Sequence, residues 1–235
     1  MNILSIDTST MMSSTALMED GIILADFNLN QEKTHSESLV PMIEYMLHGL
    51  GMTPADVDVF AVSVGPGSFT GIRIGMTVAK TMAQVFQKPI YGVSTLQALA
   101  CGLPDRGLLI PLLDARGGRV YYGEYRWEGD IPISLDGDDL IESEDLFAQL
   151  KEVKEPMVFL GEIAAAYREQ IDSLHQARIS LPMQNSCFAK QICYLAERKY
   201  KAKQPSEFDI IHPNYVRKSQ AQRELEMRKN NGSPF

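Results

Sequence analysis

Residues 57–75 read VDVFAVSVGPGSFTGIRIG, and this stretch decides the fold. Its first eight residues are an almost continuous apolar run, which predicts a parallel strand buried on both faces. The run ends at the turn Gly65-Pro66-Gly67-Ser68, and helical spacing follows from Phe69 to about Gln87, with Ser68 as the N-cap. The turn lacks the Gly-Lys-Ser/Thr of a P-loop and the spacing of a dinucleotide fingerprint. Two interpretations stay open for it: a tight structural turn, or a contact to an anion or nucleotide at a helix start.

The segments around this stretch predict a two-lobed α/β protein. Asn2–Asp7, Ser14–Met18 and Ile22–Phe27 have the pattern of an antiparallel meander, and Ser36–Leu50 has helical spacing. A strand that ends in aspartate and turns into another strand recurs at Asp114, which indicates a weak internal repeat. We therefore expect the two-lobed actin-like ATPase (ribonuclease H-like) fold, with a mixed five-stranded sheet and flanking helices in each lobe. The predicted lobes are residues 1–103, completed by 205–235, and residues 104–204.

Composition excludes several classes of protein. Lys plus Arg is 22 and Asp plus Glu is 30, so the net charge of −8 disfavours a stand-alone nucleic-acid binder. Only the C-terminal end is basic, which predicts either a solvated tail or an auxiliary contact to RNA or an acidic partner. Apolar stretches are too short to span a membrane, so we expect a cytoplasmic protein. Three cysteines without a CxxC pair indicate reduced thiols rather than a disulfide scaffold or zinc finger.

The chemistry-bearing residues do not form a recognisable catalytic centre. The four histidines include no HxxxH pair and the chain has no GxSxG elbow, so we predict no metal site and no catalytic residues. Asp7 and Asp114 end equivalent strands, where an ATPase of this fold would direct carboxylates at Mg²⁺ and phosphates. Each aspartate could instead cap its own turn. The candidate nucleotide contacts are Asp7, Thr8, Ser9, Gly65, Gly67, Ser68 and Asp114.

The first two predicted helices have more apolar surface than one sheet can cover. Small residues recur every fourth position from Gly71 to Ala83, and Ile74, Val78 and Met82 form a second apolar stripe. Core filling explains any single residue, but the combination favours a surface for another polypeptide. The candidate interface residues are Leu39, Met42, Ile43, Tyr45, Met46, Phe69, Gly71, Ile72, Gly75, Met76, Ala79, Met82 and Ala83.

Six segments in this order resemble the bacterial TsaB family, also called YeaZ. They are Ile3–Thr10 (ILSIDTST), His35-Ser36-Glu37 with Leu39 and Pro41, residues 65–75, Gly92–Leu96, Asp114-Ala115-Arg116 with Val120-Tyr121, and Pro213–Arg217. The resemblance spans residues 3 to about 217, and GPGSFTGIRIG is its most specific segment. It implies an actin-like fold without catalysis of its own.

The resemblance also implies partners. Family members assist the transferase TsaD and the ATPase TsaE in forming N6-threonylcarbamoyladenosine at adenosine 37 of tRNAs that read codons beginning with adenine. Their first two helices contact TsaD, or a second copy when the protein is alone. Where TsaD has its histidine pair, this chain has Ser94-Thr95-Leu96-Gln97-Ala98. ATP or ADP at the partner interface, and tRNA contacted indirectly or through the basic C-terminal region, are further expectations. A stand-alone small-molecule ATPase or kinase, or a glycoprotease-like peptidase, is the alternative.

Overall fold

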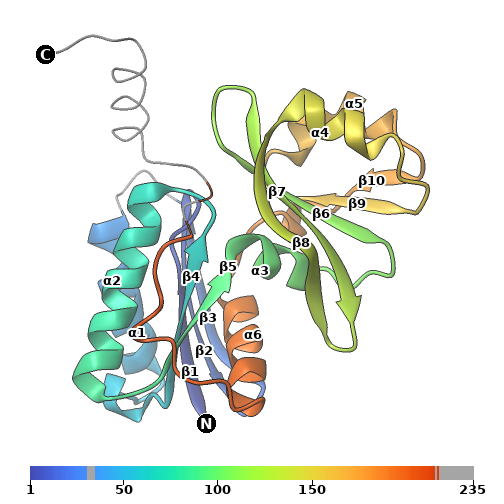
Figure 1. The fold of residues 1–235 in the computed structure, drawn as a ribbon. Helices are drawn as coiled ribbons and strands as arrows, with labels where there is room; N and C mark the ends of the chain where they lie inside the picture. Colours follow the sequence, from blue (N-terminus) through green and yellow to red (C-terminus); the bar gives the residue numbers. More distant parts are fainter. Residues whose placement is uncertain (31–34, 215, 217–235) are drawn as a thin grey trace, which may run out of the picture.

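The chain folds into two lobes, each built on a five-stranded mixed sheet (Figure 1). The computed structural model describes residues 1–30, 35–214 and 216. The strands are β1 (Asn2–Asp7), β2 (Met12–Glu19), β3 (Ile22–Asn30), β4 (Val59–Gly65), β5 (Ile90–Ser94), β6 (Leu108–Asp114), β7 (Arg119–Glu128), β8 (Ile131–Glu142), β9 (Met157–Leu160) and β10 (Ala177–Ile179). The helices are α1 (His35–Gly49), α2 (Phe69–Phe86), α3 (Thr95–Cys101), α4 (Ser143–Leu150), α5 (Arg168–Asp172) and α6 (Ala189–Lys201), with 3-10 turns η1 (Pro54–Asp56), η2 (Ala164–Tyr167) and η3 (Pro182–Gln184).

The two sheets have the same topology. The first has the order β3-β2-β1-β4-β5, and the second has β8-β7-β6-β9-β10 when read in the same direction. In both, the first three strands of the lobe are antiparallel and the last two join in parallel. This repeated order confirms the internal repeat expected from Asp7 and Asp114, and it is the order of the actin-like ATPase fold.

Helices cover both faces of the first sheet. Helices α1 and α2 lie on one face, where Leu4, Ile6 and Phe60 meet Leu39 and Ile72 in a single core. Helix α1 begins at His35, so Pro41 lies inside the helix rather than near its start as the sequence suggested. The Pro41 ring is exposed, on the side of the helix away from the sheet. Helix α2 begins where predicted, with Ser68 Oγ accepting the N–H of Gly71 at 3.2 Å.

The opposite face of the first sheet is covered by α6, which returns from the end of the chain (Figure 1). The Ala189 N–H donates to Ser14 Oγ at 2.7 Å, and Ser5 Oγ donates to the Ala189 carbonyl at 2.6 Å. The predicted second lobe, residues 104–204, included this helix. Its contacts with β1 and β2 place it in the first lobe, because small buried residues such as Cys193 let it lie directly on the strands.

The lobes share one hydrophobic core. The cluster that contains Ile3 and Val59 of the first sheet continues through α3 and α6 to Leu109 and Tyr125 of the second. The β7–β8 hairpin adds polar contacts across the boundary. Trp127 Nε1 donates to the Leu103 carbonyl at 3.0 Å, and Ser94 Oγ donates to Asp138 Oδ2 at 2.6 Å.

Residues 204–214 run back along the first lobe. The Glu207 carboxylate accepts the Gly92 N–H at 2.7 Å, and the Asn214 N–H donates to the Val64 carbonyl at 2.7 Å. This described part of 205–235 therefore lies against β4 and β5 of the first lobe. The sequence pattern also predicts a weak, charged helix at Gln220–Lys229, which lies outside the described residues. Among the described residues, no helix is both long and apolar enough to cross a membrane.

Candidate functional site

The glycine-rich turn and the end of β1 lie against each other. Gly67 has φ 151°, and a Cβ there would sit 2.2 Å from the Ser9 carbonyl oxygen. The Ser68 N–H donates to that same carbonyl at 2.7 Å, and Thr8 Oγ1 donates to the Gly71 carbonyl at 2.7 Å. The structure thus brings together five of the candidate nucleotide contacts: Asp7, Thr8, Ser9, Gly67 and Ser68.

The Asp7 carboxylate is fully buried at the centre of this group. Its Oδ1 accepts hydrogen bonds from the Ser9 N–H at 3.0 Å, from Ser9 Oγ at 2.7 Å and from Ser63 Oγ. Its Oδ2 is buried without a hydrogen-bond partner among the described residues. One oxygen therefore caps the chain's own turn, and the other is a buried acceptor without a hydrogen-bond partner among the described residues.

The surroundings of Asp7 are acidic. Partial desolvation raises the pKa of Glu162, and the charge of Asp7 raises it further. Burial also raises the pKa of the fully buried Cys187 thiol, and the charge of Asp7 adds to that shift. A phosphate placed here would meet two carboxylates, and a compensating cation would be required.

The residues present do not fit a nucleotide phosphate with its metal ion. The Ser68 N–H is used by Ser9 and the Gly71 N–H by Ser68, so two donors at the start of α2 are already satisfied. No group of three His, Cys, Asp or Glu side chains among the described residues is placed to hold a metal ion. The geometry stabilises a turn and offers a phosphate no complete cradle.

Two other candidate nucleotide contacts have structural roles. Asp114 is exposed, and its Oδ1 accepts the Arg116 N–H at 2.7 Å, so it caps its own turn. Gly65 has φ 104°, and a Cβ there would lie 2.9 Å from Ile72 Cδ1 and 3.0 Å from the Asn214 carbonyl oxygen. Glycine at this position admits the returning C-terminal segment.

Most of the candidate interface residues are buried within the chain and face its own sheet. A Cβ on Gly71 would sit 1.9 Å from the Thr8 carbonyl oxygen, and one on Gly75 would sit 2.4 Å from Thr8 Oγ1. The small-residue stripe thus lets α2 approach the end of β1, not a second polypeptide. The buried members are Leu39, Ile43, Met46, Gly71, Ile72, Gly75, Met76, Ala79 and Ala83.

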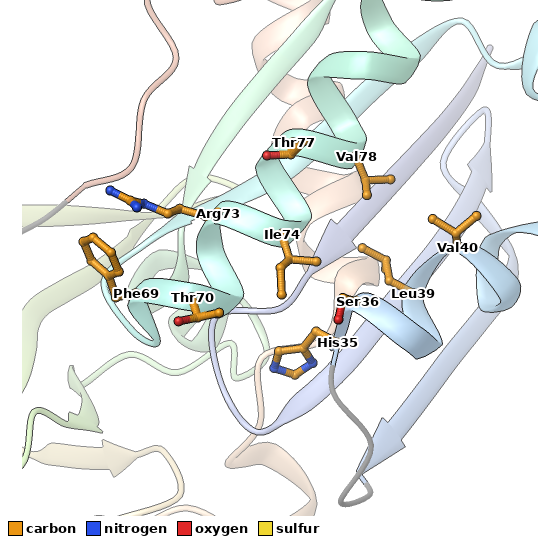
Figure 2. A pocket seen from close by; sticks show the side chains of 10 residues that line it. All are labelled: His35, Ser36, Leu39, Val40, Phe69, Thr70, Arg73, Ile74, Thr77 and Val78. Carbon is orange, nitrogen blue, oxygen red and sulfur yellow. The ribbon is translucent and has the colours of Figure 1, made fainter.

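An apolar groove remains on the outer side of α1 and α2 (Figure 2). Its volume is about 410 Å³, and Val40 on its rim is 52% exposed. Figure 2 shows Leu39 and Val40 of α1 on one side and Ile74 and Val78 of α2 on the other. The groove is lined by His35, Ser36, Leu39, Val40, Phe69, Thr70, Arg73, Ile74, Thr77 and Val78.

Four candidate interface residues keep exposed surface on these helices: Met42, Tyr45, Phe69 and Met82. Tyr45 is 72% exposed and its ring centroid lies 5.7 Å from that of Phe27. The Arg73 guanidinium stacks 3.9 Å from the centre of the Phe69 ring at the start of α2. Sequence reasoning missed Val40 and Thr77, although the second stripe of Ile74 and Val78 indicated the groove.

The basic C-terminal region is largely neutralised where the structure describes it. Arg198 pairs with Asp130 at 2.5 Å, Lys199 with Glu207 at 2.8 Å, and Lys201 with Glu197 at 2.9 Å. These three cations therefore hold parts of the chain together. Lys203, in the same basic region, is exposed. The remaining basic residues of that region, Arg217, Lys218, Arg223, Arg228 and Lys229, lie outside the described residues.

The repeated sheet order and the aspartate at the end of β1 define the class of protein: a two-lobed member of the actin-like ATPase fold. Comparisons with known proteins narrow this class. A family model described as "TsaD: tRNA N6-adenosine threonylcarbamoyltransferase" matches residues 23–228. The solved structure of YeaZ from Pseudomonas aeruginosa superposes with a TM-score of 0.76 at 24% identity, over 91% of this chain and 99% of that chain.

Two curated relatives carry the same name. The tRNA threonylcarbamoyladenosine biosynthesis protein TsaB of Bacillus subtilis is 32% identical over 225 residues, which are 94% of this chain and 96% of that protein. TsaB of Escherichia coli is 37% identical over 139 residues, which are 55% of this chain and 60% of that protein. The chain belongs to the TsaB (YeaZ) family.

Proposed function

We propose that this chain is a non-catalytic subunit in the formation of N6-threonylcarbamoyladenosine at adenosine 37 of tRNAs that read codons beginning with adenine. It binds and activates the transferase TsaD, together with the ATPase TsaE. The observation that carries the proposal is the outer groove of α1 and α2. The sheet beneath these helices is already covered, yet Val40, Ile74 and Val78 still form an apolar surface that water solvates poorly.

The same surface would serve a second copy of the chain when TsaD is absent. A homodimer and the TsaD heterodimer would then compete for one groove, so the two assemblies exclude each other. We place this assembly in the cytoplasm, where tRNA is modified. Because Arg198, Lys199 and Lys201 are paired within the chain, tRNA contact would fall to the partner or to basic residues beyond 216.

Nucleotide binding is a separate question, and it concerns Asp7 and the residues that donate hydrogen bonds to it. ATP or ADP at the boundary with TsaD would have to reach the Asp7 carboxylate, which is fully buried in this chain. Isothermal titration with Mg-ADP, using the chain alone and then the TsaD complex, tests this. Heat of binding that appears only with TsaD would assign the nucleotide to the interface. Binding to the isolated chain would contradict the conclusion that its own residues do not form a complete phosphate site.

Reconstitution tests the main proposal. Purified TsaD and TsaE are given tRNA and threonylcarbamoyl-AMP, with and without this chain, and the modified nucleoside is measured by mass spectrometry. We expect modification only when the chain is present. Equal modification without it refutes the proposal.

A charge placed on the groove rim tests the surface. Val40→Asp should weaken TsaD capture by at least about tenfold, because a carboxylate would be buried against apolar atoms. Leu135→Asp is the matched control, since Leu135 is 42% exposed but lies on β8 of the other lobe. Equal capture by both variants contradicts the groove as the docking surface.

The stand-alone enzyme is the alternative, and the buried, unpartnered Asp7 Oδ2 is the observation that favours it. It predicts that the purified chain alone hydrolyses ATP, phosphorylates a small molecule or cleaves a peptide, and that Asp7→Ala abolishes the activity. Turnover by the isolated wild-type chain that Asp7→Ala removes would establish this alternative.

A further inference from the structure

His35, the first residue of α1, connects the groove to the sheet. Its ring forms one wall at the mouth of the groove (Figure 2). Nε2 lies 2.9 Å from the Thr10 carbonyl oxygen, in the turn between β1 and β2, and Nδ1 lies 2.6 Å from Ser13 Oγ on β2. One side chain therefore joins the start of α1 to two places on the first sheet.

The contact with Thr10 fixes the position of one hydrogen on the imidazole. A carbonyl oxygen can only accept, so Nε2 must carry the hydrogen. In the neutral ring Nδ1 then accepts from the Ser13 hydroxyl. Ser38 Oγ lies 3.3 Å from Ser13 Oγ, and Ser13 has already used its only hydrogen, so Ser38 donates to Ser13. We assign this chain of bonds from donor and acceptor chemistry.

The segment that His35 contacts also holds α2. Thr8 Oγ1 donates to the Gly71 carbonyl at 2.7 Å, and the Ser9 carbonyl accepts the Ser68 N–H at 2.7 Å. Thr10, the next residue, accepts from His35 of α1. Three consecutive residues thus fix the first turns of both helices, which are the two walls of the groove.

We infer that His35 is a positioning residue of the partner-binding groove, and that it acts through the hydrogen bond that its Nε2–H donates to Thr10. Its bond to Thr10 sets the distance between the α1 and α2 walls, so that Val40 and Ile74 face a partner together. The inference rests on the proposed function for the identity of that partner, the TsaD protein of the same organism.

Two measurements test the inference. The first is the tautomer: nitrogen NMR of the ¹⁵N-histidine-labelled chain at mildly alkaline pH should show His35 protonated at Nε2 and unprotonated at Nδ1. An Nδ1–H ring, or an averaged signal from both tautomers, overturns the assignment. This result does not depend on TsaD.

The second measurement is TsaD capture by titration. His35→Ala should weaken capture by roughly tenfold, the effect of losing two modest hydrogen bonds. His35→Gln should recover most of the loss, because its amide nitrogen can still donate to the Thr10 carbonyl. His48→Ala is the control, since His48 is exposed in the last turn of the same helix. Unchanged capture by folded His35→Ala, or no recovery with His35→Gln, overturns the inference.

Two controls distinguish a failure of the inference from a folding defect and from a failure of the proposed function. If His35→Ala does not fold, Ser13→Ala removes the bond to Nδ1 and the weaker bond with Ser38 but leaves the bond from Nε2 to Thr10, and it should lower capture by a smaller factor. Full capture by Ser13→Ala would then count against the inference. If the wild-type chain itself does not bind TsaD, the proposed function fails and the inference fails with it, whichever tautomer the NMR measurement shows.

Discussion

Replacing Gly71 by alanine would destabilise the fold itself, and the structure gives the size of the effect. The new Cβ would sit 1.9 Å from the Thr8 carbonyl oxygen, where ordinary contact begins near 3.4 Å. The obstacle is backbone, so α2 must move by more than an ångström. Overpacking of this kind costs about 1–3 kcal/mol, and losing the bond from Thr8 Oγ1 costs about 1 kcal/mol more. Alanine's higher helix propensity returns about 1 kcal/mol. We expect a net loss of about 1–3 kcal/mol.

Urea unfolding followed by circular dichroism measures this loss. Gly49→Ala is the control, because Gly49 is also helical and nothing lies within 4 Å of a Cβ placed there. It should be neutral or slightly stabilising. TsaD capture is measured on both folded variants. A Gly71→Ala chain of wild-type stability that fails to bind TsaD would refute the reasoning, since the small-residue stripe would then be a partner surface.

Three further experiments, two with variants and one with the native protein, have expected outcomes. Burial raises the pKa of Asp138 above its ordinary 3.8, so its contribution to stability is present in acid and is lost as pH rises through the folded value. When the free energy of unfolding is measured with urea at several pH values, the Asp138→Asn variant should lack this loss of stability. Parallel pH profiles of the wild type and the variant would contradict the prediction. Burial raises the pKa values of Cys101 and Cys193 to about 12, so neither thiol should react with iodoacetamide in the native protein at neutral pH. Rapid native labelling, read by mass spectrometry, would show otherwise. Tyr45→Ser should change stability by less than about 1 kcal/mol yet weaken TsaD capture about tenfold, because Tyr45 is 72% exposed. Undiminished capture would remove Tyr45 from the interface.

The local features of the fold were predictable from the sequence. The apolar run before Gly65, the Ser68 cap and the second aspartate at Asp114 are short-range patterns, and each matches the structure. The repeat of these patterns was enough to predict two lobes of one topology, because strand order follows from the sequence of elements within each lobe.

The orientation of the helix faces was not predictable in the same way. Spacing shows that Gly71, Gly75, Ala79 and Ala83 share a face, but not which neighbour meets it. For Gly71 and Gly75 that neighbour is Thr8, distant in sequence, whose carbonyl and hydroxyl oxygens occupy the space that a side chain would need. The same limit applies to α6, because only a long-range contact shows that Ala189 lies against the first sheet.

The position of α6 has a consequence for synthesis on the ribosome. The first sheet is translated early, but the helix that covers Ala16 and Met18 on its second face is not made until residues 189–201. Until then the strands of the first sheet leave the ribosome with one apolar face exposed to solvent and to chaperones. Truncation after residue 103 should therefore yield an insoluble fragment, and a ribosome stalled near residue 180 should hold a nascent chain that proteases cut within β2 and β3.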